Sequence, residues 1–200
     1  MGPESPDGAK PKDWDYTPEM DITLRQFTRD DLARLIDWVD RNGPEFFVQW
    51  AGTAFEFPLD ESQLETHLSE AEGPEASRRL FAAVDDASGE VVGHVELSRI
   101  DRANRSATIS RLLVGEPSAR GKGLGAQIVS CLLDVAFGEM QLDRVDLYVL
   151  EFSLPAIRVY EGLGFKTEGP VVEARRTGGK YWNAYYMAML KEQWLGRSVG

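Results

Sequence analysis

The chain has 200 residues and a formal net charge of −11 at pH 7, from 33 acidic and 22 basic side chains. Hydrophobic residues make up 42% of it, and no apolar run approaches the ~20 residues that a bilayer-spanning helix needs, so one soluble domain is expected. The acidic balance argues against a nucleic-acid binder, because phosphate backbones attract clustered Lys and Arg. It suits a cationic substrate, or it simply keeps the protein in solution.

The first segment has the composition of a tail. Residues 1–19 are rich in Pro, Gly and charge and show no periodicity, so we expect a flexible tail ahead of a folded domain over residues 20–195. The tail lacks the basic and apolar regions of a signal peptide. The single cysteine, Cys131, cannot form an internal disulfide. These features predict a cytoplasmic protein without a membrane partner.

The domain is predicted to begin with a strand and a helix. Residues 22–26 alternate in polarity, and residues 30–39 carry apolar side chains at helical spacing. From residue 42 to residue 59 the composition turns to Gly, Pro and aromatic side chains, which indicates a structured loop. Asp60, with Gln three residues later, has the spacing of a capping box and predicts a second helix to about Ala71.

Three strands are expected next, over residues 80–84, 91–98 and 107–114, and their short connections predict an antiparallel meander. Apolar residues at helical spacing then predict a long helix over residues 124–140, followed by a strand over residues 144–150.

The last part of the chain is predicted to form a helix and a hairpin. Pro155 lies where the first turn of the helix belongs, and Gly164 ends it. Two strands, over residues 165–176 and 181–190, flank a Gly-Gly turn. An exposed late strand is a candidate surface for a homodimer.

A Gly-rich turn with two cationic side chains lies between the third strand of the meander and the long helix. It includes Arg120-Gly-Lys-Gly-Leu-Gly125. Residues without Cβ let successive N–H groups point into one concavity, and the following helix adds the positive end of its dipole. The turn therefore predicts a phosphate-binding site.

Two nucleotide-binding motifs have similar patterns. A Walker A loop needs Ser or Thr after its Lys, whereas Gly123 follows Lys122, which excludes that motif. The relaxed dinucleotide pattern Gly-x-Gly-x-x-Ala is satisfied by residues 121–126. That fingerprint belongs after the first strand of a βαβ unit, and this turn follows the last strand of a meander.

Two motifs of the chain occur together in one known family. Residues 120–125 match Arg/Gln-x-x-Gly-x-Gly/Ala, and residues 153–165 match Asn-x-x-Ala-x-x-x-Tyr-x-x-x-Gly-Phe with Ser153 in place of Asn. By these motifs, residues 22–190 resemble a GCN5-related N-acetyltransferase (GNAT), a family that moves an acetyl group from acetyl-CoA to an amine and uses the first motif to bind its cofactor. The resemblance, which is nearest to the ribosomal-protein and small-amine branch, implies an α/β (α+β) fold. Its mixed, mostly antiparallel and splayed sheet would have helices on both faces.

The resemblance also implies an acetyl-CoA site. The pyrophosphate is expected on the backbone of the Gly-rich turn, with Arg120 and Lys122 either contacting phosphate or framing the loop. The splayed strand would offer main-chain groups to the pantetheine and to the thioester carbonyl. The expected cofactor-binding residues are Leu112, Leu113, Val114, Arg120, Gly121, Lys122, Gly123, Leu124, Gly125, Ala126, Ser153, Ala156 and Tyr160.

Two side chains are candidates for the proton transfers. The resemblance makes Tyr160 the general acid for the leaving sulfur. Glu96 shares a strand face with His94 and is the first candidate for the base that deprotonates the amine. The alternatives for Glu96 are an exposed strand glutamate or an ion pair with Arg99 or Arg111.

The aromatic segment is expected to form the acceptor wall. Phe47 and Trp50 would hold a cation against their rings, and Glu45 and Glu56 would anchor it. The alternative is a hydrophobic plug beneath a long loop. Two histidines and one cysteine at unrelated spacings give no metal signature.

The expected function is direct transfer, through a ternary complex, from acetyl-CoA to a primary amine, either of a small molecule or of a protein N-terminus. The first alternative is a non-catalytic acyl-CoA-binding regulatory module. The second is a dinucleotide-dependent oxidoreductase.

Overall fold

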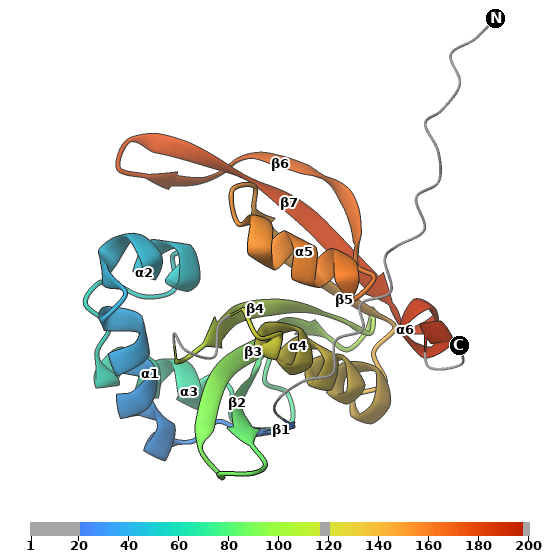
Figure 1. Cartoon of the computed structure of the whole chain (residues 1–200), viewed down its shortest axis with the longest axis horizontal. Coiled ribbons are helices and arrows are strands. Elements are labelled where there is room, and N and C mark those ends of the chain that lie inside the picture. The colour runs from blue at the N-terminus through green and yellow to red at the C-terminus, as the bar shows by residue number, and fades with distance from the viewer. Residues whose placement is uncertain (1–20, 117–120, 198–200) are drawn as a thin grey trace, which may run out of the picture.

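A seven-stranded sheet with the strand order β1-β2-β3-β4-β5-β7-β6 organises the molecule (Figure 1). The computed structural model describes residues 21–116 and 121–197, so the predicted tail and Arg120 lie outside the described residues. Neighbouring strands are antiparallel except β4 and β5, which are parallel. The strands are β1 (Ile22–Gln26), β2 (Arg79–Asp85), β3 (Val91–Asp101), β4 (Ser106–Val114), β5 (Arg144–Leu150), β6 (Lys166–Thr177) and β7 (Lys180–Leu190).

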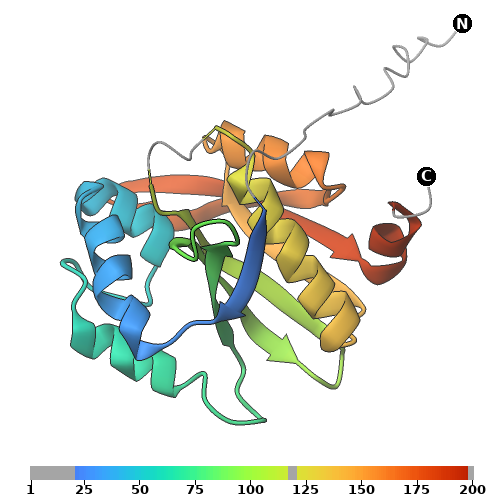
Figure 2. The same ribbon diagram turned by 60° about the horizontal axis from the view of Figure 1, so that its bottom comes forward.

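Helices cover both faces of the sheet. Figure 2 shows α4 lying across one face, and α4 packs beside α5 there. No helix in the described part of the chain is long and apolar enough to span a membrane. The helices are α1 (Leu32–Asp40), α2 (Gly43–Ala51), α3 (Glu61–Ser69), α4 (Leu124–Asp134), α5 (Leu154–Gly162) and α6 (Lys191–Arg197); a 3-10 turn (Arg29–Asp31) precedes α1 and a π-helical turn (Val135–Glu139) extends α4.

The prediction of a loop over residues 42–59 is wrong in its first half, where α2 forms. Gly43 adopts φ 79° immediately before the helix turns, and Pro44 occupies the first turn, where its missing N–H costs nothing. Phe47 and Trp50, three residues apart, then give the helix one buried face. The predicted cap of α3 is confirmed, since Asp60 Oδ1 accepts a hydrogen bond from the backbone N–H of Gln63 at 2.8 Å.

The hydrophobic core forms two layers, one on each side of the sheet. In the first, α4 buries Ile128 and Leu132 completely against the inner strands. In the second, α1, α2 and α3 pack on the other face, against side chains that include Leu113 of β4. Since β-strand side chains alternate between faces, β4 is held from both sides.

The sheet divides between β4 and β5. The two strands pair only from Ser106–Ile109 to Arg144–Leu147. Beyond that register β4 continues along β3 to Val114, and β5 continues along β7 to Leu150. The expected splay is therefore present, and one edge of residues 110–113 has no strand partner within the described residues.

Candidate active site

A bulge shapes the free edge of β4. The register against β3 shifts between His94 and Glu96, and Arg111 opposite them adopts φ 50°. A non-Gly residue at positive φ is strained and needs support. The indole Nε1 of Trp50 supplies it by donating a hydrogen bond to the Arg111 carbonyl at 3.1 Å. Helix α2 thereby fixes the strand segment where the thioester is expected.

The end of β4 is also anchored. The N–H of Gly115 donates to the Val92 carbonyl at 2.9 Å, and a Cβ on Gly115 would collide with the ring of Trp38. Glu116 accepts hydrogen bonds from Trp38 Nε1 at 3.1 Å and from Arg41 Nη2 at 3.2 Å. The Gly-rich turn therefore starts from a point that α1 holds in place.

The predicted phosphate cradle has suitable geometry. Gly121 and Gly123 both adopt φ 75°, and Gly123 caps α4, where its carbonyl accepts from the N–H of Ala126 at 2.9 Å. The first N–H groups of α4, from Leu124 and Gly125, have no acceptor within the helix. A Cβ on Gly121 would meet no described atom within 4 Å. Open space, N–H groups and a helix dipole fit a diphosphate.

The second predicted motif lies at α5. The N–H of Ser153 donates to the Leu150 carbonyl at 2.9 Å, and its side chain makes no capping bond to the described residues. Ala156 packs against the first core layer. Tyr160 is 7% exposed, and its ring packs edge to face on that of Phe165, with the ring centroids 5.7 Å apart. Burial raises the pKa of Tyr160 to about 12, so the hydroxyl stays protonated at neutral pH.

Glu96 lies at the centre of a buried polar network. It is 1% exposed. It binds Arg111 Nη1 at 2.6 Å, His67 Nε2 at 3.1 Å and His94 Nε2 at 3.2 Å. Arg78 Nη1 donates to His67 Nδ1 at 2.5 Å, which leaves Nε2 of that ring as the donor to Glu96.

These contacts decide the charge of the carboxylate. Burial raises the pKa of Glu96, but hydrogen bonds from His67 and His94 and the charge of Arg111 outweigh it, and the pKa lies well below its usual range. Glu96 thus forms the ion pair with Arg111 that was the alternative interpretation. A carboxylate held by these donors is a weak base, and proton abstraction by Glu96 stays a prediction.

The expected acceptor wall is divided between core and surface. Phe47 and Trp50 are 3% and 8% exposed and belong to the second core layer, in which Trp50 stacks on Phe55 at 5.9 Å. Glu45 and Glu56 are exposed. The two rings therefore form a plug, as the alternative interpretation had it, and contact with a cation stays a prediction for all four side chains.

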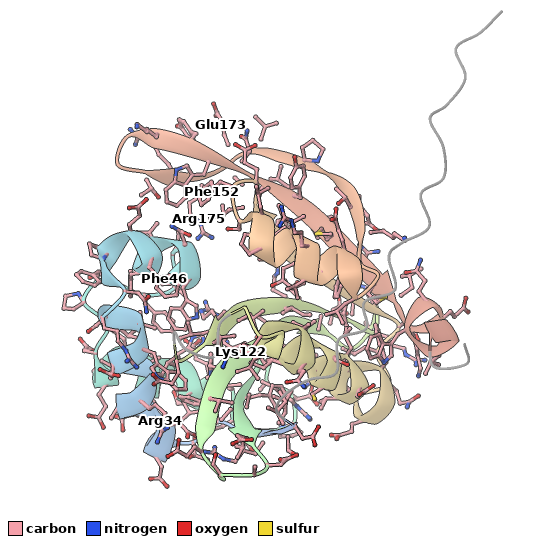
Figure 3. The ribbon with its side chains drawn as sticks, in the orientation of Figure 1. Arg34, Phe46, Lys122, Phe152, Glu173 and Arg175 are labelled. Atoms are coloured by element: carbon pink, nitrogen blue, oxygen red, sulfur yellow. The ribbon has the colours of Figure 1, made fainter. Side chains whose placement is uncertain are left out.

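Two polar side chains of this region were not identified as site residues from the sequence. His67 lies on α3 between Leu64 and Leu68, and a His on the apolar face of a helix was the available signal. Arg175 on β6 gave no periodic signal, yet its Nη1 donates to the Val48 carbonyl of α2 at 2.8 Å. Figure 3 shows Arg175 extending from the β6–β7 hairpin toward α2.

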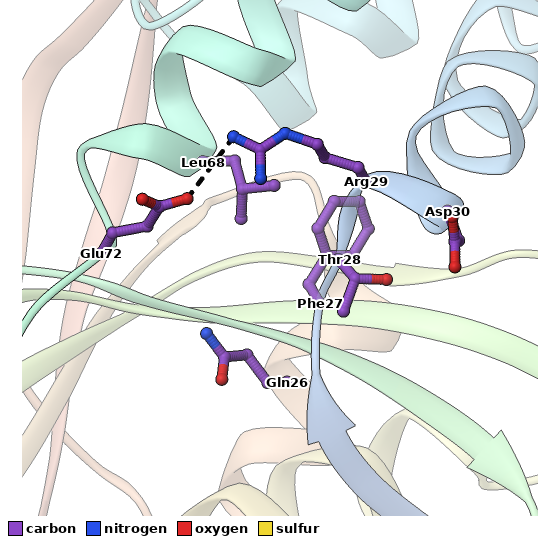
Figure 4. Close-up of a pocket in the computed structure, with 7 residues that line it drawn as sticks. All are labelled: Gln26, Phe27, Thr28, Arg29, Asp30, Leu68 and Glu72. Atoms are coloured by element: carbon purple, nitrogen blue, oxygen red, sulfur yellow. Dashed lines mark ion pairs between the residues drawn. The ribbon is translucent and has the colours of Figure 1, made fainter.

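A separate open pocket lies where β1 meets α3 (Figure 4). Arg29 and Glu72 form an ion pair of 3.5 Å at its rim. It includes none of the predicted site residues. Its lining consists of Gln26, Phe27, Thr28, Arg29, Asp30, Leu68 and Glu72.

Comparison with known proteins agrees with this geometry. The family model for the acetyltransferase (GNAT) domain matches residues 21–166. The spermidine N(1)-acetyltransferase of Vibrio cholerae is 31% identical over 178 residues, which cover 88% of this chain and 97% of that protein. An L-amino acid N-acetyltransferase of Escherichia coli K12 is 29% identical over 114 residues, covering 57% and 68%.

A solved structure shares the fold over most of its length. The Vibrio cholerae spermidine N-acetyltransferase in complex with CoA and spermine superposes with a TM-score of 0.74 at 27% identity, covering 87% of this chain and 98% of that one. The family match excludes the dinucleotide-dependent oxidoreductase. The chain belongs to the GNAT family and is an acetyl-CoA-dependent N-acetyltransferase.

Proposed function

We propose that the acceptor is the primary amine of a small molecule, rather than a protein N-terminus. The relatives named above act on spermidine and on L-amino acids, and both are small primary amines. The observation that carries the proposal is the free edge of β4, which leads into the Gly121–Gly123 cradle, with protonated Tyr160 of α5 in the core layer against which Leu112 packs. This arrangement suits a bound thioester approached by a small nucleophile.

The chemical step assigns a role to each group. N–H groups of the cradle hold the diphosphate, and main-chain groups of Leu112–Val114 bind the pantetheine and the thioester carbonyl. The amine nitrogen bonds to the acetyl carbon as the carbon–sulfur bond breaks. The nitrogen attacks as the neutral amine and loses one proton to solvent. The leaving sulfur receives one proton from the Tyr160 hydroxyl, and the resulting tyrosinate regains a proton from solvent.

We propose that Glu96 is a positioning residue. Its carboxylate holds Arg111 at the bulge, and the bulge sets the direction of the main-chain groups that follow it in β4. A base at Glu96 would need the carboxylate to release one of its donors. Glu96→Gln should therefore alter the KM for acetyl-CoA, whereas a base would chiefly change kcat.

The test combines binding and turnover. Calorimetric titration with acetyl-CoA, CoA and NAD comes first, followed by thiol release from acetyl-CoA with a panel of small amines and an N-terminal peptide. We expect acetyl-CoA binding, no NAD binding, and thiol release with small amines. Binding without thiol release to any small amine would overturn the proposed acceptor, and so would release with the peptide alone.

Two further properties are proposals. A homodimer would pair the outer strand β6, on which Val172 is 71% exposed at the edge of the sheet. A cytoplasmic location is supported by the lone Cys131, which is free and half-buried. Sedimentation tests the homodimer, and fluorescence microscopy of a tagged chain tests the location.

A further inference from the structure

The guanidinium of Arg175 is a half-buried cation in an unusual setting. Its Nη1 donates to the carbonyls of Val48 and Gln49 at 2.8 and 3.3 Å, in the last turn of α2. Among the described residues, no carboxylate oxygen lies within 4 Å of it, and Nε and Nη2 have no hydrogen-bond partner. The side chain joins the β6–β7 hairpin to α2 (Figure 3).

The neighbouring backbone leaves room for this group. Gly52 directly follows α2, and a Cβ added to it would lie 3.0 Å from Arg175 Nη2. The guanidinium is thus held by backbone groups on one side. Carbonyls at the end of a helix offer partial negative charge, but they do not neutralise a cation.

Arg175 contacts α2, the helix that carries the expected acceptor wall. Trp50, the next residue after Gln49, binds the Arg111 carbonyl, so the last turn of α2 holds both Arg175 and the bulge of β4. Arg111 has Glu96 as its counter-ion, while Arg175 has none among the described residues. Burial, and then the charge of Arg111, lowers the pKa of Arg175. This part of the site is short of negative charge.

A polyamine acceptor carries several positive charges, and no unpaired buried carboxylate in the described residues is available to bind one of them. Two of the buried acids in the described residues are paired with arginines, Asp31 with Arg25 at 2.7 Å and Glu96 with Arg111 at 2.6 Å. The third, Asp85, closes a turn through Ser88. Among the described residues, the Arg111 charge has Glu96 as its partner, and the Arg175 charge close to it has no ion-pair partner.

We propose that Arg175 binds a carboxylate of the acceptor, so that the amine acetylated belongs to an amino-acid-like molecule rather than to a polyamine. The inference rests on the proposed function, because it names the substrate class of the same site. A guanidinium edge with two free donors binds a carboxylate through paired, charge-assisted hydrogen bonds.

The experiment compares acceptors that differ only in the carboxylate. Thiol release from acetyl-CoA is followed with L-lysine against cadaverine, L-phenylalanine against 2-phenylethylamine, and spermidine. We expect kcat/KM for the amino acid of at least one pair to exceed that of its decarboxylated partner about tenfold or more. Arg175→Gln should remove this preference, lowering kcat/KM about 10- to 100-fold for the amino acid alone.

A matched control separates charge from structure. Arg176 is the exposed neighbour of Arg175 and lies over the Tyr181 ring, so Arg176→Gln removes the same charge without touching α2. It should leave the preference intact, and Arg175→Lys should retain part of it. Thermal unfolding confirms that each variant is folded.

The possible outcomes separate a failure of the carboxylate contact at Arg175 from a failure of the proposed function. Equal or better transfer to the decarboxylated amines or to spermidine overturns the inference and leaves the proposed function standing. An equal loss with both members of a pair in Arg175→Gln also overturns it, because that would show a purely structural tether. A protein that binds acetyl-CoA and transfers to no amine overturns the proposed function itself, and the inference with it.

Discussion

Tyr160 provides the most direct test of the chemistry. Its side chain is buried and its hydroxyl is protonated, and none of the described residues forms a hydrogen bond with that hydroxyl. Tyr160→Phe keeps the ring and its contact with Phe165, so acetyl-CoA affinity by calorimetry should change less than about twofold while kcat falls about 100-fold, as for loss of a general acid. Tyr148→Phe, at an exposed tyrosine, is the control. An unchanged kcat in Tyr160→Phe would remove this residue from the mechanism.

Glu96 dominates the buried electrostatics. Glu96→Gln leaves the Arg111 charge uncompensated, so the free energy of unfolding should fall by about 3 kcal/mol in urea titrations. Glu168→Gln is the matched control, because its pair with Arg144 at 2.6 Å lies at the surface and is worth about 1 kcal/mol or less. Equal losses in the two variants would contradict the role given to the buried network.

The same carboxylate should make stability depend on pH. Its folded pKa is depressed, so its contribution is complete above the unfolded value of about 4.3 and is lost as the pH falls below that value toward the folded pKa. The Tm of the wild type should therefore drop more steeply than that of Glu96→Gln below about pH 5. Parallel Tm curves for the two proteins would exclude this linkage.

At this scale the sequence reveals local motifs but not the contacts between distant residues. Tyr160 and the glycines of the turn lie within local motifs, so their spacing is visible in the chain. The partners of Glu96, by contrast, come from α3 and from β4, and only the folded sheet brings them together. The positive φ of Arg111 also left no trace in the sequence, because the bulge depends on support from Trp50.

Among the elements, the turn before α4 is the most sensitive to substitution. Gly123 adopts φ 75° as the cap of α4, a conformation that costs a residue with Cβ about 1 kcal/mol. Gly123→Ala should also weaken acetyl-CoA binding at least about tenfold by turning N–H groups away from the phosphates. Gly138→Ala is the control, since an added Cβ there meets no described atom within 4 Å. Calorimetry that found both variants equal to the wild type would argue against the cradle.

Periodicity located the strands and most helices because each has one apolar face or a buried run. The failure at α2 has a physical reason. Aromatic side chains crowd both of its sides, with Phe46 partly buried and Phe47 and Trp50 fully so, and the flanking Gly and Pro suggest a loop. Helix α6 directly follows β7 and was also missed, because it is too short for a periodic pattern.

At the scale of the whole molecule, the exposed edge at β6 is where the proposed homodimer can be tested. If two copies pair along this strand, Val172→Lys should place like charges at the interface and shift sedimentation from dimer to monomer. Val171→Lys is less suitable, because that side chain is partly buried. A wild-type monomer at all concentrations would dismiss the edge as an interface.

The short junction between β4 and β5 has a mechanical consequence. Only Ser106–Ile109 and Arg144–Leu147 join the two parts of the sheet, whereas β3 and β4, and β5 and β7, pair along most of their lengths. When a force pulls β4 away from β5, these two strands should separate first. The force needed should be lower than that for any other pair of neighbouring inner strands. The splay between β4 and β5, where the thioester is expected to bind, would then also be the place where mechanical unfolding begins.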